Sequence, residues 1–63
     1  QMSSPSKKQL AAHHSRRLKT MQKQLMAMAD QWEDLDQFCV NSLVELADQA
    51  KKTAAELKED LAA

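Results

Sequence analysis

The chain lacks the residues that make tight turns and cross-links. Among its 63 residues there is no glycine, one proline and one cysteine, Cys39. A β-rich domain needs glycine in its tight turns, so this composition argues against one. A single cysteine excludes an internal disulfide and fits a reducing compartment. Chains of this length usually need a disulfide, a metal or a partner chain for stability, so we expect a partner.

Aromatic residues and long apolar runs are also scarce. Trp32 and Phe38 are the only aromatics, which leaves little to stack on nucleic-acid bases. No run approaches the roughly 18 apolar residues that suggest a transmembrane helix. No apolar core of a secretory signal precedes a small-residue cleavage site. We therefore expect an intracellular protein that does not associate with membranes. Because the chain starts with Gln1 rather than Met, we also expect a piece of a longer protein.

Acidic residues are missing from the first 29 positions. Residues 1–29 carry six Lys or Arg, whereas residues 30–63 carry nine Asp or Glu and three Lys. The two halves therefore have charges of +6 and −6, which sum to the formal net charge of zero. A lone helix prefers anions at its N-terminus and cations at its C-terminus, the reverse of this order. We expect a neighbouring helix to match these charges.

Residues of high helix propensity dominate what is present. At 100° per residue, one apolar stripe keeps its direction over about fifty residues. We predict an all-α fold in which one long helix forms an oligomeric coiled coil or helical bundle. The charge pattern favours the antiparallel form. The helix spans 5–62 after a disordered lead-in at 1–4, with Ser3 or Ser4 as N-cap and Pro5 at the first helical position.

The spacing within the stripe divides the predicted helix into two segments. Residues 18–35 follow the 3-4 steps of a heptad seam, and residues 35–57 form a wider apolar segment. A two-stranded coiled coil buries only a narrow seam, so the wide segment favours a three- or four-helix bundle or a globular partner. The predicted interface residues are Leu18, Met21, Leu25, Met28, Trp32, Leu35, Phe38, Cys39, Val40, Leu43, Val44, Leu46, Ala50 and Leu57.

A helical hairpin is the competing layout. Asp30–Glu33 and Ser42–Glu45 both match the capping-box pattern, so a second helix could begin at either place. Neither break carries a glycine or proline, which favours the continuous helix.

The titratable clusters do not predict an enzyme. Asp30, Glu33, Asp34 and Asp36 crowd together, and such carboxylates can serve acid–base chemistry or bind divalent cations. A single helix offers no pocket, so we predict no catalytic residue and no cofactor. Adjacent His13 and His14 point about 100° apart and cannot chelate together, and no cluster has the spacing of a zinc site. We therefore predict no metal site.

The basic half raises a nucleic-acid hypothesis. Arg16, Lys19 and Lys23 share one helical face, as in basic regions that precede a leucine zipper. The apolar stripe runs through the same half, at Leu18 and Met21, which favours packing over insertion into a groove. A basic-helix nucleic-acid binder with a C-terminal dimerisation seam stays the second alternative.

Ser4-Pro5-Ser6-Lys7 resembles the sites of proline-directed, cyclin-dependent kinases. The resemblance makes Ser4 a candidate phosphosite and implies a nuclear setting in preference to a cytoplasmic one. A phosphate there would lie at a helix N-terminus, where negative charge is stabilising.

These observations predict an oligomerisation module of a larger intracellular scaffold. The expected partner is a second copy, in an antiparallel homodimer or tetramer, because parallel packing would place like charges side by side. The stripe's midpoint places the two-fold axis near residues 32–39. The first alternative is a heteromeric binding helix, in which residues 35–57 dock on a different protein subunit.

Overall fold

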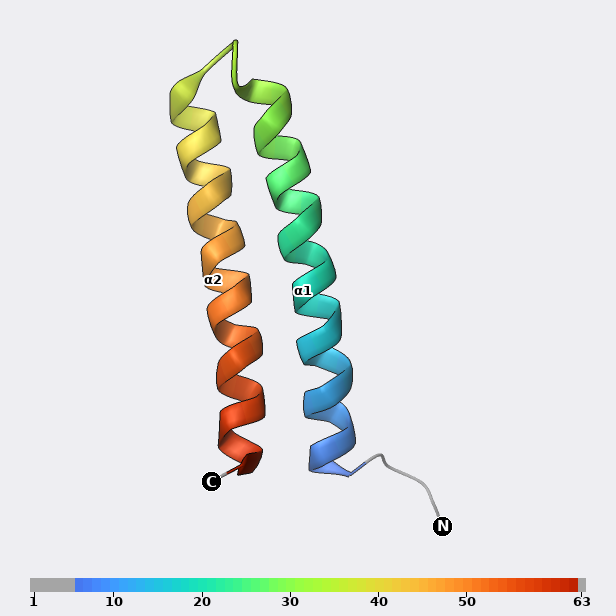
Figure 1. The fold of residues 1–63 in the computed structure, drawn as a ribbon. Coiled ribbons are helices and arrows are strands. Elements are labelled where there is room, and N and C mark those ends of the chain that lie inside the picture. Colours follow the sequence, from blue (N-terminus) through green and yellow to red (C-terminus); the bar gives the residue numbers. More distant parts are fainter. Residues whose placement is uncertain (1–5, 63) are drawn as a thin grey trace.

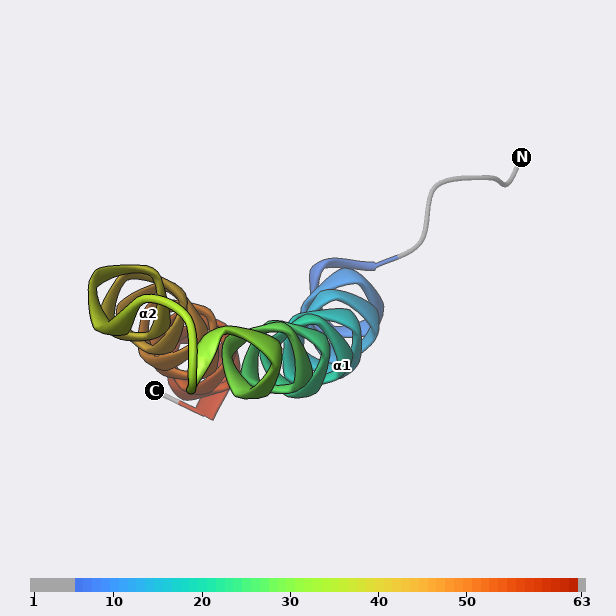
Figure 2. The same cartoon turned by 90° about the horizontal axis from the view of Figure 1, so that it is seen from above.

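The protein is a hairpin of two antiparallel helices. The computed structural model describes residues 6–62, with side chains described for residues 6–59. Helix α1 spans Lys7–Trp32 and helix α2 spans Gln37–Ala62. They lie side by side along their whole length, with both chain ends at the end opposite the turn (Figure 1). The hairpin measures 52 × 24 × 11 Å, and from above it is a single layer of two helices (Figure 2).

The predicted all-α class is confirmed, but the uninterrupted helix over 5–62 is wrong. The chain reverses at residues 33–36, where the backbone amides of Leu35 and Asp36 both donate to the Trp32 carbonyl at 2.9 Å. Within the described residues no backbone has a positive φ, so this turn does not need glycine. The absence of glycine and proline therefore did not exclude a reversal here. The two-fold axis expected near residues 32–39 is wrong for the same reason, because the chain turns back there.

Asp36 starts the second helix. Its Oδ1 accepts a hydrogen bond from the Phe38 amide at 2.9 Å, and its carbonyl accepts from the Val40 amide at 3.2 Å. This is the geometry of an N-cap residue. Glu33 and Asp34 precede the same helix N-terminus, where negative charge is favourable. The acids that opposed the dipole of one long helix are thus well placed for the dipole of α2.

Neither predicted capping box marks the break. Helix α1 continues through Asp30 and ends at Trp32, whereas Ser42 lies inside α2. A real capping box lies at the other end, where Ser6 Oγ accepts from the Gln9 amide and Gln9 Oε1 accepts from the Ser6 amide, both at 3.1 Å. Helix α1 therefore starts at Lys7 with Ser6 as its cap, which corrects the predicted cap at Ser3 or Ser4.

The first five positions lie outside the described residues. The predicted lead-in at 1–4, the placement of Pro5 and the candidate phosphosite Ser4 fall there.

Small side chains form the seam between the helices. The buried residues are Ala11, Ser15 and Ala29 of α1 and Ala47 and Ala54 of α2. Partly buried residues continue both rows at alternating steps of three and four, with Leu18, Gln22 and Leu25 in α1 and Val40, Leu43, Ala50 and Leu57 in α2. This is the spacing of a coiled-coil seam. Burial of a methyl group contributes only about 0.8 kcal/mol, so this seam stabilises the hairpin modestly.

The predicted apolar stripe overlaps this seam only in part. Eight of the predicted interface residues are partly buried, namely Leu18, Leu25, Cys39, Val40, Leu43, Val44, Ala50 and Leu57. The other six remain exposed, namely Met21, Met28, Trp32, Leu35, Phe38 and Leu46. Large apolar residues dominate the predicted stripe, whereas the fully buried positions of the seam carry alanine or serine, because small side chains allow two helices to approach closely.

Within residues 6–62, no helix combines the length and the apolar character needed to cross a membrane.

Candidate protein–protein interface

One broad face of the hairpin carries an open apolar groove between the helices. We call the following residues the apolar groove: Leu18, Met21, Gln24, Leu25 and Met28 of α1, with Leu46, Gln49, Ala50 and Thr53 of α2. Its volume is about 350 Å³. A second hollow extends it toward the chain ends, lined by His14, Arg17, Leu18, Met21 and Leu57. Met21 and Met28 are each 46% exposed, and Leu46 is 54% exposed.

The groove is a second seam on each helix. Along α1 its apolar members, Leu18, Met21, Leu25 and Met28, are spaced three and four residues apart. Along α2 the row of Leu46, Ala50 and Thr53 continues to Leu57 at the same spacing. A helix with two adjacent seams packs against two neighbours, as in a four-helix bundle. One hairpin gives each helix only one neighbour, so this second row of each helix is left open.

The turn carries further exposed apolar side chains. Leu35 is 76% exposed and Phe38 is 75% exposed, and Trp32 at the end of α1 is 40% exposed. Solvent-exposed apolar residues that are contiguous commonly mark an interaction site. All three were predicted as interface residues, and the contact between α1 and α2 does not bury them.

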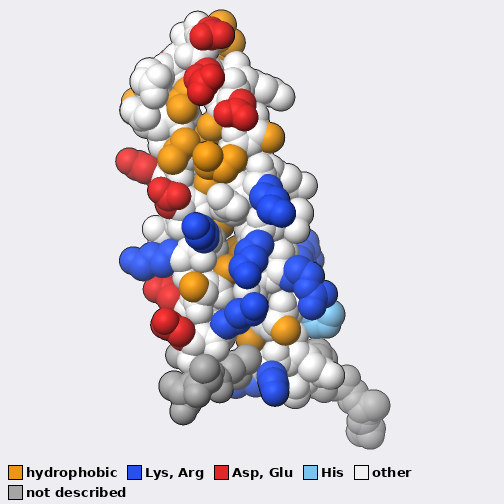
Figure 3. All heavy atoms as spheres, viewed as in Figure 1, with side chains coloured by type: hydrophobic (Ala, Val, Ile, Leu, Met, Phe, Trp, Pro, Cys, Tyr) orange, Lys and Arg blue, Asp and Glu red, His pale blue; other side chains and the backbone are white. Residues whose placement is uncertain are grey.

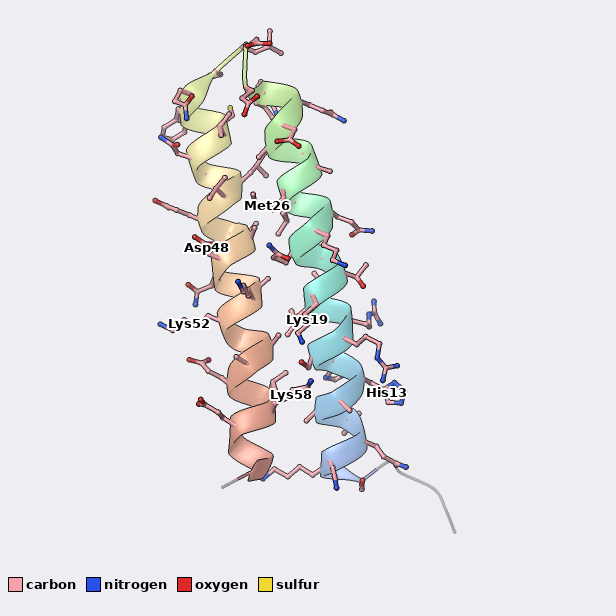
Figure 4. All side chains as sticks on the ribbon, viewed as in Figure 1. His13, Lys19, Met26, Asp48, Lys52 and Lys58 are labelled. Carbon is pink, nitrogen blue, oxygen red and sulfur yellow. The ribbon has the colours of Figure 1, made fainter. Side chains whose placement is uncertain are left out.

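The opposite broad face is basic over much of its length. Figure 3 shows Lys and Arg side chains over both helices in the half nearer the chain ends, with apolar side chains and then Asp and Glu toward the turn. Arg16, Lys19, Lys51 and Lys58 line two hollows on this face. Lys19 and Lys58 lie between the helices, whereas Lys52 and His13 project from the outer edges (Figure 4).

The histidines and the acidic residues do not assemble into a metal site. His14 lines the second hollow, which extends the apolar groove, whereas His13 projects from the outer edge of α1 (Figure 4). Within the described part of the chain, no group of three or more His, Cys, Asp or Glu side chains could hold a metal ion. The crowded acids instead surround the turn, where Asp36 caps α2.

Cys39 is a half-buried thiol in the first turn of α2. Partial burial raises its pKa, and the negative charge and side-chain hydrogen bond of Asp36 raise the pKa further. The thiolate is the reactive form of cysteine, so this environment lowers the reactivity of Cys39 near neutral pH.

The seam residues that the sequence analysis missed share one property. Ala11, Ser15 and Ala29 are small residues with little hydrophobic weight, although their positions continue the heptad row of Leu18 and Leu25. A search for small residues at heptad spacing would have found them.

The chain matches no protein-family model, and no curated protein or solved structure matches it either.

Proposed function

We propose that this chain is a protein–protein interaction module in which two hairpins associate through their apolar grooves. The product is an antiparallel four-helix bundle. The observation that carries this proposal is the contrast between the seam and the groove. The fully buried side chains between α1 and α2 are all small, whereas large ones such as Met21, Met28 and Leu46 line the groove and remain exposed. Burial of each such side chain contributes about 1.5–3 kcal/mol.

The size of the face supports a second copy as the occupant. The hairpin's extents of 52 × 24 Å give its broad face an area of about 1,200 Å². A stable interface needs roughly 800 Å² from each partner. Because both helices contribute similar apolar rows to the groove, the face is also self-complementary.

Charge at the groove's edges supports the same partner. Arg17 lines the groove extension on α1, and Glu56 is an exposed neighbour of Leu57 on α2. A two-fold axis parallel to the helices places each α1 beside the copy's α2, so Arg17 would face Glu56 of the copy. An exposed pair contributes only about 0–1 kcal/mol, so it favours one orientation more than it adds stability. The orientation role expected for the charge split is thus retained in a different assembly.

Sedimentation equilibrium tests the proposal. We expect a species of twice the 7.1 kDa chain mass. Met28→Glu should weaken the dimer by about a hundredfold or more, because it places a carboxylate in the apolar contact. Met26→Glu is the matched control, since Met26 is 37% exposed and lies outside the groove.

Two results would contradict the homodimer. One is equal weakening by Met26→Glu and Met28→Glu. The other is a wild-type chain that is a stable, helical monomer at all concentrations. That monomer would favour the heteromeric alternative, in which the groove binds a helix pair of a different subunit.

A further inference from the structure

The fold gathers cations that the sequence separates. We define the basic cluster as Arg16 and Lys19 of α1 with Lys51 and Lys58 of α2. One hollow is lined by Lys19, Lys51, Ala55, Lys58 and Glu59, and another by Ala12, Ser15, Arg16, Lys19 and Lys58. The two hollows share Lys19 and Lys58, so they form one continuous site. Four cations and a single acid line it.

This arrangement leaves an excess of positive charge in the shared hollows, because four cations and one acid line them. The antiparallel layout brings the basic half of α1 beside a segment of α2 that is rich in acids. The residues that line the shared hollows from α2 nevertheless include Lys51 and Lys58. Like charges held close together repel, and a bound anion would relieve that repulsion.

The dimensions and the floor of the site fit a compact anion. Lys51 and Lys58 are seven residues apart, which is about 10 Å along a helix. The floor consists of Ala12, Ser15 and Ala55, whose small side chains let a ligand approach the helix surfaces. Ser15 is 0% exposed, and its hydroxyl oxygen has no hydrogen-bond partner among the residues that the structure describes. That hydroxyl is a donor without an acceptor at the base of the cluster.

We propose that the basic cluster binds a compact, phosphate-dense anion such as a di- or triphosphate. The lysines supply point charges, and Arg16 supplies a guanidinium that can bind two phosphate oxygens at once. Recognition uses the phosphates, because neither hollow is lined by an aromatic side chain on which a base could stack. The site lies on the face opposite the apolar groove, so it stays open in the proposed dimer.

The test is a titration of the full chain with inorganic tripolyphosphate at low salt, followed by backbone amide NMR. We expect saturable shifts that concentrate at residues 15–19 and 51–58, and weaker binding of orthophosphate. Lys19→Gln and Lys58→Gln should each weaken binding by about tenfold. Lys52→Gln removes the same charge from the outer edge of α2 (Figure 4) and should weaken it by about twofold or less.

Any of four results would overturn the proposal. Binding that does not saturate, or shifts spread evenly over all lysines, would show a diffuse charge effect. Equal weakening by Lys52→Gln and Lys58→Gln would show the same. Tighter binding of a short DNA duplex than of tripolyphosphate would assign the face to nucleic acid.

Lysine and glutamine have similar helix propensity, so the variants should fold, and circular dichroism checks this. Sedimentation equilibrium measures dimer formation through the apolar groove. It therefore distinguishes a failure of the proposed dimer from a failure of anion binding.

Discussion

At the scale of single residues, size decides which side chains face the partner helix. Ala47 and Ala54 are fully buried, whereas the larger Leu46 beside Ala47 is more than half exposed. A leucine at a fully buried position of the seam would force the helices apart, whereas a leucine in the groove leaves their approach unchanged. The identity of the small residues therefore determines the rotation of each helix about its own axis.

Ala47→Leu should lower the free energy of unfolding by about 1–3 kcal/mol, because it overpacks the seam. Ala27→Leu is the matched control, since Ala27 is exposed on α1 and its replacement should change stability by about 0.5 kcal/mol or less. Urea unfolding followed by circular dichroism measures both. If Ala47→Leu raised the free energy of unfolding, position 47 would have room for a larger side chain. The two helices would then have to pack differently from the seam described above.

Alkylation of Cys39 should be slow at neutral pH and should accelerate as the pH rises through its raised pKa. The folded chain favours the protonated thiol, so this contribution to stability is present below the ordinary thiol pKa and lost above the raised one. Asp36→Asn removes the neighbouring charge, lowers the Cys39 pKa and should speed alkylation at pH 8. Asparagine still caps a helix, so α2 should remain folded.

The rate of iodoacetamide reaction, followed by mass spectrometry, gives the pH profile. Asp34→Asn is the control, because Asp34 does not contribute to the raised pKa of Cys39. If Asp36→Asn and Asp34→Asn were alkylated at equal rates, Asp36 would not be the group that raises the pKa of Cys39.

At the scale of elements, four residues convert one periodic pattern into two helices. The amides of Leu35 and Asp36 share the Trp32 carbonyl, and the Asp36 side chain then caps α2. The predicted helical content was confirmed because propensity and periodicity are local properties. The reversal was missed because its signal is one aspartate among several acids, and local periodicity is the same on both sides of the turn.

Asp36→Ala should cost about 0.5–2 kcal/mol of stability, since the Phe38 amide loses its acceptor. Asp34→Ala removes an equal charge from the same turn without removing the cap, so its cost should be smaller. Thermal unfolding of the two variants side by side separates capping from charge. If Asp34→Ala were as damaging, the dipole of α2 and not the cap would explain the effect.

At the scale of the whole molecule, the hairpin has one filled seam and two open faces. One face carries the apolar groove. The other carries Lys and Arg over the half nearer the chain ends (Figure 3). The predicted antiparallel neighbour exists, but it is the chain's own second helix. A chain of this length was expected to need a partner, and in the proposed dimer the second copy would bind at the apolar groove.

The melting temperature should therefore rise with protein concentration. Dimerisation stabilises the folded state by mass action, so a hundredfold increase in concentration should add roughly 2–3 kcal/mol per dimer. Calorimetry across that range measures the change. Met28→Glu should melt at a temperature that does not depend on concentration, and Met26→Glu should behave like the wild type.

Composition alone was enough to establish the helical class, because helix formation depends on local propensity and on the absence of residues that interrupt it. The order of the charged residues along the chain established the separation of basic and acidic halves. The place of the reversal, the choice of alanine over leucine for the seam, and the meeting of Lys19 with Lys51 and Lys58 depend on contacts between residues far apart in the chain. Those contacts are decided by how closely two helices can approach, which is a property of the folded pair and not of either helix alone.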